Sequence, residues 1–451
     1  MKAHLSVAFA VSLAVASLPG ALGWGAAGHE IVATIAQIHL HPAVLPVLCD
    51  ILHPGSSSSS AGPPCHLAPI AAWADRVRGS PAYRWTAPLH YVGAIDDSPG
   101  DACEFPGPRG WAGRHNINVL AAVGNKTAVL AEALSGERSI TDGEVALKFL
   151  VHFVGDMHMP LHLTGKERGG NGAKVTFDGR VTNLHSVWDG LLIAQALRTI
   201  PANYSRPLAD APGVEAHLRG TIYDSYIRRI MHEGFGVGAG ASTGAGRFDG
   251  VDEWLSCPAD EAPEVASPGG LLSAVFQSIQ NVLGLGRRDD AIIEKRHQAM
   301  RPKFPDGTHV SNAKRSWGSF RSTIGDEKQW DDGVLCPYAW AREIHELNCA
   351  LPVWPAELSV QHSSGAADPE LDSHSGCAHD DDVGAAMAGR PRPHPDLLEL
   401  DTPAYAGHIR AQWVVERLLA MAGIRLAGIL NGLVLGGDPD DEMLANVYPR
   451  L

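Results

Sequence analysis

Hydrophobic residues recur at spacings of three and four along most of this chain, and this pattern predicts α-helices. The helices expected from it span residues 30–40, 68–77, 111–134, 143–154, 191–198, 214–233, 335–349 and 405–433. Strand-like alternation is confined to residues 175–177, between the glycine-rich run 169–172 and the turn Asp178-Gly179, and it predicts one small β-hairpin. We therefore expect a mainly α-helical chain.

Two stretches depart from the helical pattern. Residues 257–333 mix an amphipathic patch, 271–285, with charged and irregular sequence, and residues 353–397 are rich in Pro, Ser, His and Asp. Such composition is typical of loops rather than of a packed core. We expect two long loop insertions in a single domain covering residues 24–451.

The first 23 residues have the features of a secretory signal peptide. Lys2 precedes an apolar run at 5–18, and Ala21-Leu22-Gly23 fits a small-residue cleavage site. The apolar run is short for a membrane span. The helix expected at 405–433 is apolar, but Arg425 and Asn431 interrupt it, so we interpret it as a core helix. A secreted, extracellular protein without a membrane anchor is expected.

Export makes disulfides plausible for the seven cysteines. They lack the CxxC spacing of a zinc knot, and their odd number leaves at least one unpaired or paired between chains. Cys49 and Cys65 bracket the serine run 56–60, which suggests a disulfide that closes a loop. Asn125 and Asn203 begin N-glycosylation sequons.

The net charge of −14 argues against a protein that binds duplex DNA through a basic face. It does not exclude nucleic acid as a ligand, because bound metal ions would bring local positive charge to an acidic chain.

Histidine and aspartate pairs point to such a metal site. His152 and Asp156 are four residues apart, as are His185 and Asp189, so each pair shares one helix face. His162 follows a proline at which a helix must bend or restart. One such pair could arise by chance among 22 histidines, but buried carboxylates need a partner, and two pairs with a further histidine favour metal.

Cleavage after residue 23 would make Trp24 the first residue. Its free amino group and its carbonyl oxygen could then chelate a metal, and His29 could complete that site. Taken alone, the alternative is favoured, in which Trp24 only packs and His29 caps a helix.

Four further candidates lie between the amino terminus and the histidine pairs. Asp75 and Arg78 share a helix face, either as an exposed ion pair of little energetic value or as a metal ligand beside a group that meets phosphate. The segment 87–92 reads as a strand or extended turn, in which His90 would be a ligand and Tyr91 a stacking platform.

Together, Trp24, His29 and the motifs WADRVR, PLHYV, HFVGDMHMPLH and NLHSVWD resemble those of the S1/P1 nuclease family. The resemblance implies a fold shared with zinc phospholipase C and three zinc ions. Asp75, His90, His152 and Asp156 would bind the first ion, and His162, His185 and Asp189 the second. Trp24 and His29 would bind the third, with Asp156 bridging. The resemblance also implies a Cys103–Cys349 disulfide.

The family resemblance implies a secreted endonuclease that hydrolyses single-stranded DNA and RNA to 5′-phosphorylated products. Activity on 3′-mononucleotides and a monomeric state are expected as well. Asp75 would orient the attacking water, Arg78 would neutralise phosphoryl charge, and Tyr91 would stack on an unpaired base. Two alternatives are a zinc phospholipase C, with residues 271–285 as an apolar lid, and a zinc-binding surface protein with a degenerate site.

Two departures from the family pattern leave base preference open. Gly93 stands where family members often carry Asp or Asn, although Asp96 or Asp97 could substitute. Met159 stands where Gln is common.

Overall fold

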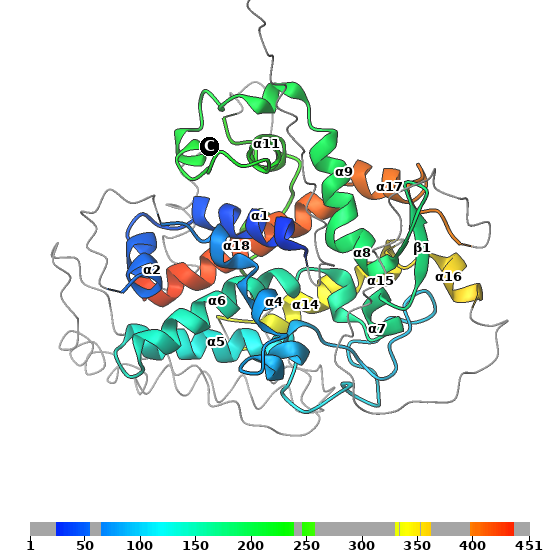
Figure 1. The fold of residues 1–451 in the computed structure, drawn as a ribbon, viewed down its shortest axis with the longest axis horizontal. Helices are drawn as coiled ribbons and strands as arrows, with labels where there is room; N and C mark the ends of the chain where they lie inside the picture. Colours follow the sequence, from blue (N-terminus) through cyan, green and yellow to red (C-terminus); the bar gives the residue numbers. More distant parts are fainter. Residues whose placement is uncertain are drawn as a thin grey trace, which may run out of the picture.

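The computed structural model describes residues 24–54, 65–238, 246–257, 330–332, 334–351, 353–361 and 397–436. Helices dominate these residues, and their one sheet is an antiparallel pair, β1 Lys174–Phe177 and β2 Arg180–Asn183. The prediction of a mainly α-helical fold with a small β-hairpin is confirmed. Figure 1 shows the hairpin at one end of the helical body, beside α7 and α8.

The core forms around α18, Val414–Leu435, which packs against α1, Ala26–Ile38 (Figure 1). Among the described residues α18 alone is long and apolar enough to span a membrane by length and composition, and 78% of its apolar window is buried. Arg425 inside it donates to the Trp254 carbonyl and pairs with Glu343. α18 is thus a core helix with its charge paired inside the protein.

The metal-site residues depend on a second helix pair, α5 Val119–Leu134 and α6 Ile140–Asp156. α5 begins later than the expected residue 111 because the Asn118 side chain caps it, accepting from the Ala121 amide at 3.0 Å. α6 is capped by Ser139, whose hydroxyl accepts from the Asp142 amide. It runs to Asp156, so one helix carries both members of the first His/Asp pair.

The remaining elements are short. Their bounds are α2 Val44–Leu52, α3 Ala68–Ala71, α4 Trp73–Val77, η1 Arg84–His90, η2 Pro160–Leu163, α7 Glu167–Gly170, α8 Leu184–Ser186, η3 Val187–Leu191, α9 Leu192–Arg198, η4 Ala202–Ser205, α10 Pro212–Glu215, α11 Asp224–Arg229, η5 Ile230–Gly234, η6 Val251–Glu253, α14 Pro337–His345, α15 Leu347–Ala350, α16 Ala356–Gln361 and α17 Ala406–Ala411.

Four expectations were wrong in detail. The segment 87–92 is no strand, because η1 is a 3₁₀ helix that contains Pro88 and ends at His90. The helix expected at 214–233 is broken where Gly220 adopts a φ of +74°. The helix expected at 405–433 breaks at Trp413, which has a φ of +56°. The segment expected as the loop 353–397 begins with a helix, α16.

Three disulfides cross-link the described residues. Cys49–Cys65 and Cys103–Cys349 are the pairs that the sequence suggested, and Cys257–Cys336 is an additional one. The signal segment 1–23 and the patch 271–285 lie outside the described residues.

Candidate metal centre

Short elements from distant parts of the chain bring the predicted ligands together. α6 supplies His152 and Asp156, α4 supplies Asp75, and His90 is the last residue of η1. All but Asp75 are buried, and the Asp75 side chain is 19% exposed. These four residues therefore form a largely buried cluster that is exposed to solvent at Asp75.

Four donor atoms in this cluster lie about as far apart as the ligands of one metal ion. They are Asp75 Oδ1, His90 Nδ1, His152 Nε2 and Asp156 Oδ2, and five of their six mutual distances lie between 2.9 and 3.7 Å. Zinc ligands at about 2.0–2.1 Å from the ion in a tetrahedral site would be about 3.3–3.4 Å apart. The four donors can therefore surround one ion of that size.

A second group consists of His162 on η2, His185 on α8 and Asp189 on η3, whose donor atoms lie within 4.8 Å of one another. His185 Nε2 is 3.1 Å from Asp189 Oδ2. Although η3 is wound as a π-helix rather than an α-helix, the spacing of four residues still brings this pair together.

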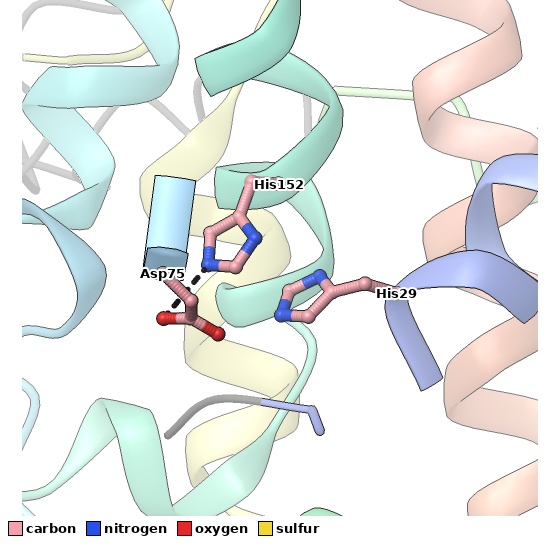
Figure 2. A group of neighbouring side chains, drawn as sticks. All are labelled: His29, Asp75 and His152. Atoms are coloured by element: carbon pink, nitrogen blue, oxygen red, sulfur yellow. Dashed lines mark ion pairs between the residues drawn. The ribbon is translucent and has the colours of Figure 1, made fainter. Parts of the chain in front are cut away.

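The amino-terminal residues lie against both groups. His29 Nε2 is 3.4 Å from Asp156 Oδ1, and the His29 ring stacks on His152 at 3.8 Å between centroids. Figure 2 shows His29, Asp75 and His152 converging from three elements. Trp24 is fully buried, and the next residue, Gly25, donates its amide to the Asp189 carbonyl at 2.8 Å. The first turn of the described chain is thus tied to the metal-ligand helices.

Unpartnered polar atoms indicate where cations would bind. Buried side-chain atoms that have no hydrogen-bond partner among the described residues include both His29 nitrogens, Asp75 Oδ1, Asp156 Oδ1, His185 Nε2 and both Asp189 oxygens. Buried polar groups are rarely left unpaired in proteins. These orphaned atoms belong to the predicted ligands, so the donor set fits metal ions.

Backbone carbonyls fix the orientation of three histidines. The Nδ1 atoms of His152, His162 and His185 lie 2.6–2.8 Å from the carbonyls of Ala71, His90 and Gly169. A histidine that donates one ring N–H to a carbonyl leaves its other nitrogen as a metal ligand. Sequence reasoning missed these carbonyls, because they come from residues up to 81 positions away.

Gly155 is a further residue that sequence reasoning missed. A Cβ there would lie 2.7 Å from His29 Nδ1, so any side chain would displace that ring. A glycine between two buried helix positions is the only signal that the sequence offers, and it is a weak one.

The ionisable side chains of the candidate metal centre shift one another's pKa values strongly. Burial lowers the pKa of His152, but the carboxylates of Asp156 and Asp75 outweigh burial and raise it to about 10. Burial acts to raise the pKa of Asp75, yet His152 and His90 hold it at about 2. Burial raises the pKa of Asp189 to about 6 despite His185. The buried carboxylates thus require positive charge, which metal ions would supply.

The other predicted residues lie around this cluster of candidate ligands. Arg78 lies 3.5 Å from Asp75, and Tyr91 is 45% exposed beside His90. Asp97 is buried and bonded to His345 at 2.9 Å, and Asp96 pairs with Arg109, so both carboxylates are engaged. Cys103, Asp97 and His345 lie close enough to hold a metal, but the Cys103 sulfur is in a disulfide.

Comparison with known proteins decides the family. Residues 24–233 match the family model described as S1/P1 Nuclease. Endonuclease 3 of Arabidopsis thaliana is 31% identical over 246 residues, which cover 53% of this chain and 68% of that protein. The chain belongs to the S1/P1 nuclease family.

Two fungal members of the S1/P1 family are also similar. Nuclease S1 of Aspergillus oryzae is 36% identical over 203 residues, and Nuclease P1 of Penicillium citrinum is 42% identical over 166 residues. The alignments cover 45% and 37% of this chain, and 64% and 57% of those relatives, less than two thirds of either. Every residue of the candidate metal centre lies inside the matched segment 24–233.

Proposed function

We propose that this protein is a secreted, zinc-dependent endonuclease that hydrolyses single-stranded DNA and RNA to 5′-phosphorylated nucleotides and also acts on 3′-mononucleotides. The observation that supports it most is the close approach of donor atoms from Asp75, His90, His152 and Asp156, with five of their six mutual distances at 2.9–3.7 Å. His162, His185 and Asp189 would hold a second zinc ion, and Trp24 and His29 a third.

When bound, zinc would lower the pKa of water at the site toward neutrality and neutralise charge on a phosphoryl oxygen. Asp75, the most exposed of the four clustered side chains, would orient the attacking water. Arg78 would donate to the phosphoryl oxygens as charge develops, while the bond from phosphorus to O3′ breaks and the 5′-phosphate remains.

Single-strand preference would come from Tyr91. Its ring is exposed beside His90, where an unpaired base could stack on it. Such a stack is worth about 1–3 kcal/mol by alanine substitution, and a base paired inside a duplex does not present its face for it.

The amino-terminal site requires removal of residues 1–23, because only a free Trp24 amine can chelate. We therefore propose export and cleavage after Gly23. The sequon residues Asn125 and Asn203 are both exposed, which suits glycosylation during export. The phospholipase C alternative depends on an apolar lid at residues 271–285, which lie outside the described residues, so no observation favours it.

The test uses secreted protein that begins at Trp24. It is given single-stranded DNA, duplex DNA and phosphatidylcholine micelles, each with and without chelator. Chelator-sensitive release of 5′-mononucleotides, mainly from the single strand, is expected. Head-group release with DNA untouched would show a phospholipase C, and silence on all three substrates would favour a binding role.

A matched protein that keeps one Met before Trp24 tests the chelating amine. It should lose at least one zinc ion and most activity, because its free amine no longer belongs to Trp24. Full zinc content in this extended protein would exclude the Trp24 amine as a ligand.

A further inference from the structure

One exposed aromatic ring lies on a short helix that ends in a predicted metal ligand, and a second follows that helix directly. Among the large hydrophobic side chains that the structure describes as exposed, Trp85 and Tyr91 are the only aromatic ones, at 58% and 45%. Trp85 lies in η1, and Tyr91 directly follows the last residue of η1, His90. Single exposed hydrophobic residues need no explanation, but a pair placed beside one metal ligand does.

The helix type sets the distance between the two residues. A 3₁₀ helix rises about 2.0 Å per residue. Trp85 precedes Tyr91 by six residues, so the two positions lie about 12 Å apart along the axis, and Tyr91 itself is extended, with a φ of −148° and a ψ of 169°. A strand with the duplex rise of about 3.4 Å per nucleotide would bridge them with three or four nucleotides, and a more extended strand with fewer.

The Trp85 ring is held in place from behind. Its indole N–H donates to the Ala82 carbonyl at 3.1 Å, which restricts the ring to one orientation. Lys126 on α5 places its ammonium 5.6 Å from the Trp85 centroid and 5.5 Å from that of Phe149. Phe149 lies one helical turn before His152, so this stack continues into the wall of the metal centre.

Lys126 places positive charge beside Trp85. Within the part of the chain that the structure describes, no carboxylate pairs with the Lys126 ammonium, which lies over the rings of Trp85 and Phe149. Lys126 is half-buried, and its lowered pKa comes from burial and from Arg138, with no carboxylate opposing them. In a chain of net charge −14, a cation beside an exposed indole is suited to an anionic group.

We propose that Trp85 is a second base-stacking platform, which binds a nucleobase two to four nucleotides from the one on Tyr91 while Lys126 contacts an intervening phosphate. Aromatic platforms combined with basic side chains are the usual means of binding single strands without sequence preference. This inference rests on the proposed nuclease function. It implies that long single strands are better substrates than dinucleotides, which cannot reach from the metal centre to Trp85.

The experiment compares kcat/KM for a thymidine dodecamer and for the dinucleotide TpT, using processed, zinc-loaded protein. Trp85→Ala should lower kcat/KM about fivefold or more for the dodecamer and leave TpT unchanged, and Trp85→Phe should restore most of the loss. Ile222→Ala, which truncates another exposed hydrophobic side chain, should change neither. Lys126→Met should reduce the slope of log kcat/KM against log salt by about 0.7, for the dodecamer alone.

An equal loss on both substrates would mean that Trp85 only supports η1, and it would overturn the proposal, as would an unchanged dodecamer rate. Wild-type protein that cuts no single strand at all would instead refute the nuclease function, and this inference with it. The two failures are therefore distinguishable.

Discussion

Replacing Asp189 with asparagine should stabilise the metal-free protein and destabilise the zinc-loaded one. The carboxylate is fully buried in η3, and burial raises its pKa from the ordinary 3.8 to about 6 despite the nearby His185. The folded state therefore holds the proton more tightly than the unfolded state. Without metal, the stability that this proton brings is present below about pH 3.8 and is lost as the pH rises through 6.

The size of the effect follows from the same pKa. Each pKa unit corresponds to about 1.4 kcal/mol, so an ionised Asp189 costs the metal-free protein about 3 kcal/mol at pH 7. Asparagine has the same shape without the charge. Asp189→Asn should thus gain up to about 3 kcal/mol at pH 7, less whatever its contact with His185 contributes, and nothing at pH 4.

Bound zinc should reverse the sign of the stability difference between Asp189→Asn and the wild type. A ligand that binds only the folded state at 1,000 times its Kd stabilises by about 4 kcal/mol. Asp189→Asn weakens one zinc site and loses much of this term, so with zinc present the wild type should be the more stable of the two.

Urea unfolding at pH 7, followed by tryptophan fluorescence, measures the free energy of unfolding of the metal-free protein in chelator and of the zinc-loaded protein in excess zinc. Asp178→Asn, which neutralises an exposed carboxylate in the hairpin turn, is the control and should stay within about 0.5 kcal/mol of wild type in both. If Asp189→Asn is less stable than wild type in chelator, the argument from burial is refuted.

Three further changes have definite expected outcomes. Arg78→Ala should slow turnover on single strands about 100-fold or more while zinc content stays whole, since on the proposed mechanism Arg78 would contact phosphate and not metal; unchanged turnover would remove it from the mechanism. Replacing Cys103 and Cys349 with serine should lower the unfolding free energy by up to about 5 kcal/mol in urea, because their disulfide closes a loop of 246 residues; a loss under 1 kcal/mol would contradict this. Burial lowers the pKa of His39 from 6.5 to about 4. The free energy of unfolding should therefore be highest above pH 6.5 and fall by up to about 3 kcal/mol as the pH drops to 4. His39→Asn should reduce this pH dependence in thermal unfolding scans.

The sequence predicted what depends on local spacing. His152 and Asp156 meet because four residues make about one helical turn, and His185 and Asp189 meet in the same way even though η3 is wound as a π-helix. The alternation that marks the hairpin was equally local. The resemblance of separate motifs to one family supplied the order in which distant ligands combine.

Contacts between distant segments could not be predicted. Asp97 looked available to a base, yet it is buried against His345, 248 residues later. The apolar residues around His90 suggested a strand, but Pro88 and the packing against α5 and α6 favour a 3₁₀ helix there. That difference matters for the proposed stacking of bases, because a 3₁₀ helix sets Trp85 and Tyr91 about 12 Å apart along its axis.

The most direct test of the trinuclear centre is anomalous diffraction at the zinc edge, from crystals of the protein beginning at Trp24. We predict three peaks, one among Asp75, His90, His152 and Asp156, one among His162, His185 and Asp189, and one at Trp24 and His29. Absence of a peak among the first four residues would contradict the account, because their spacing is the observation on which it rests.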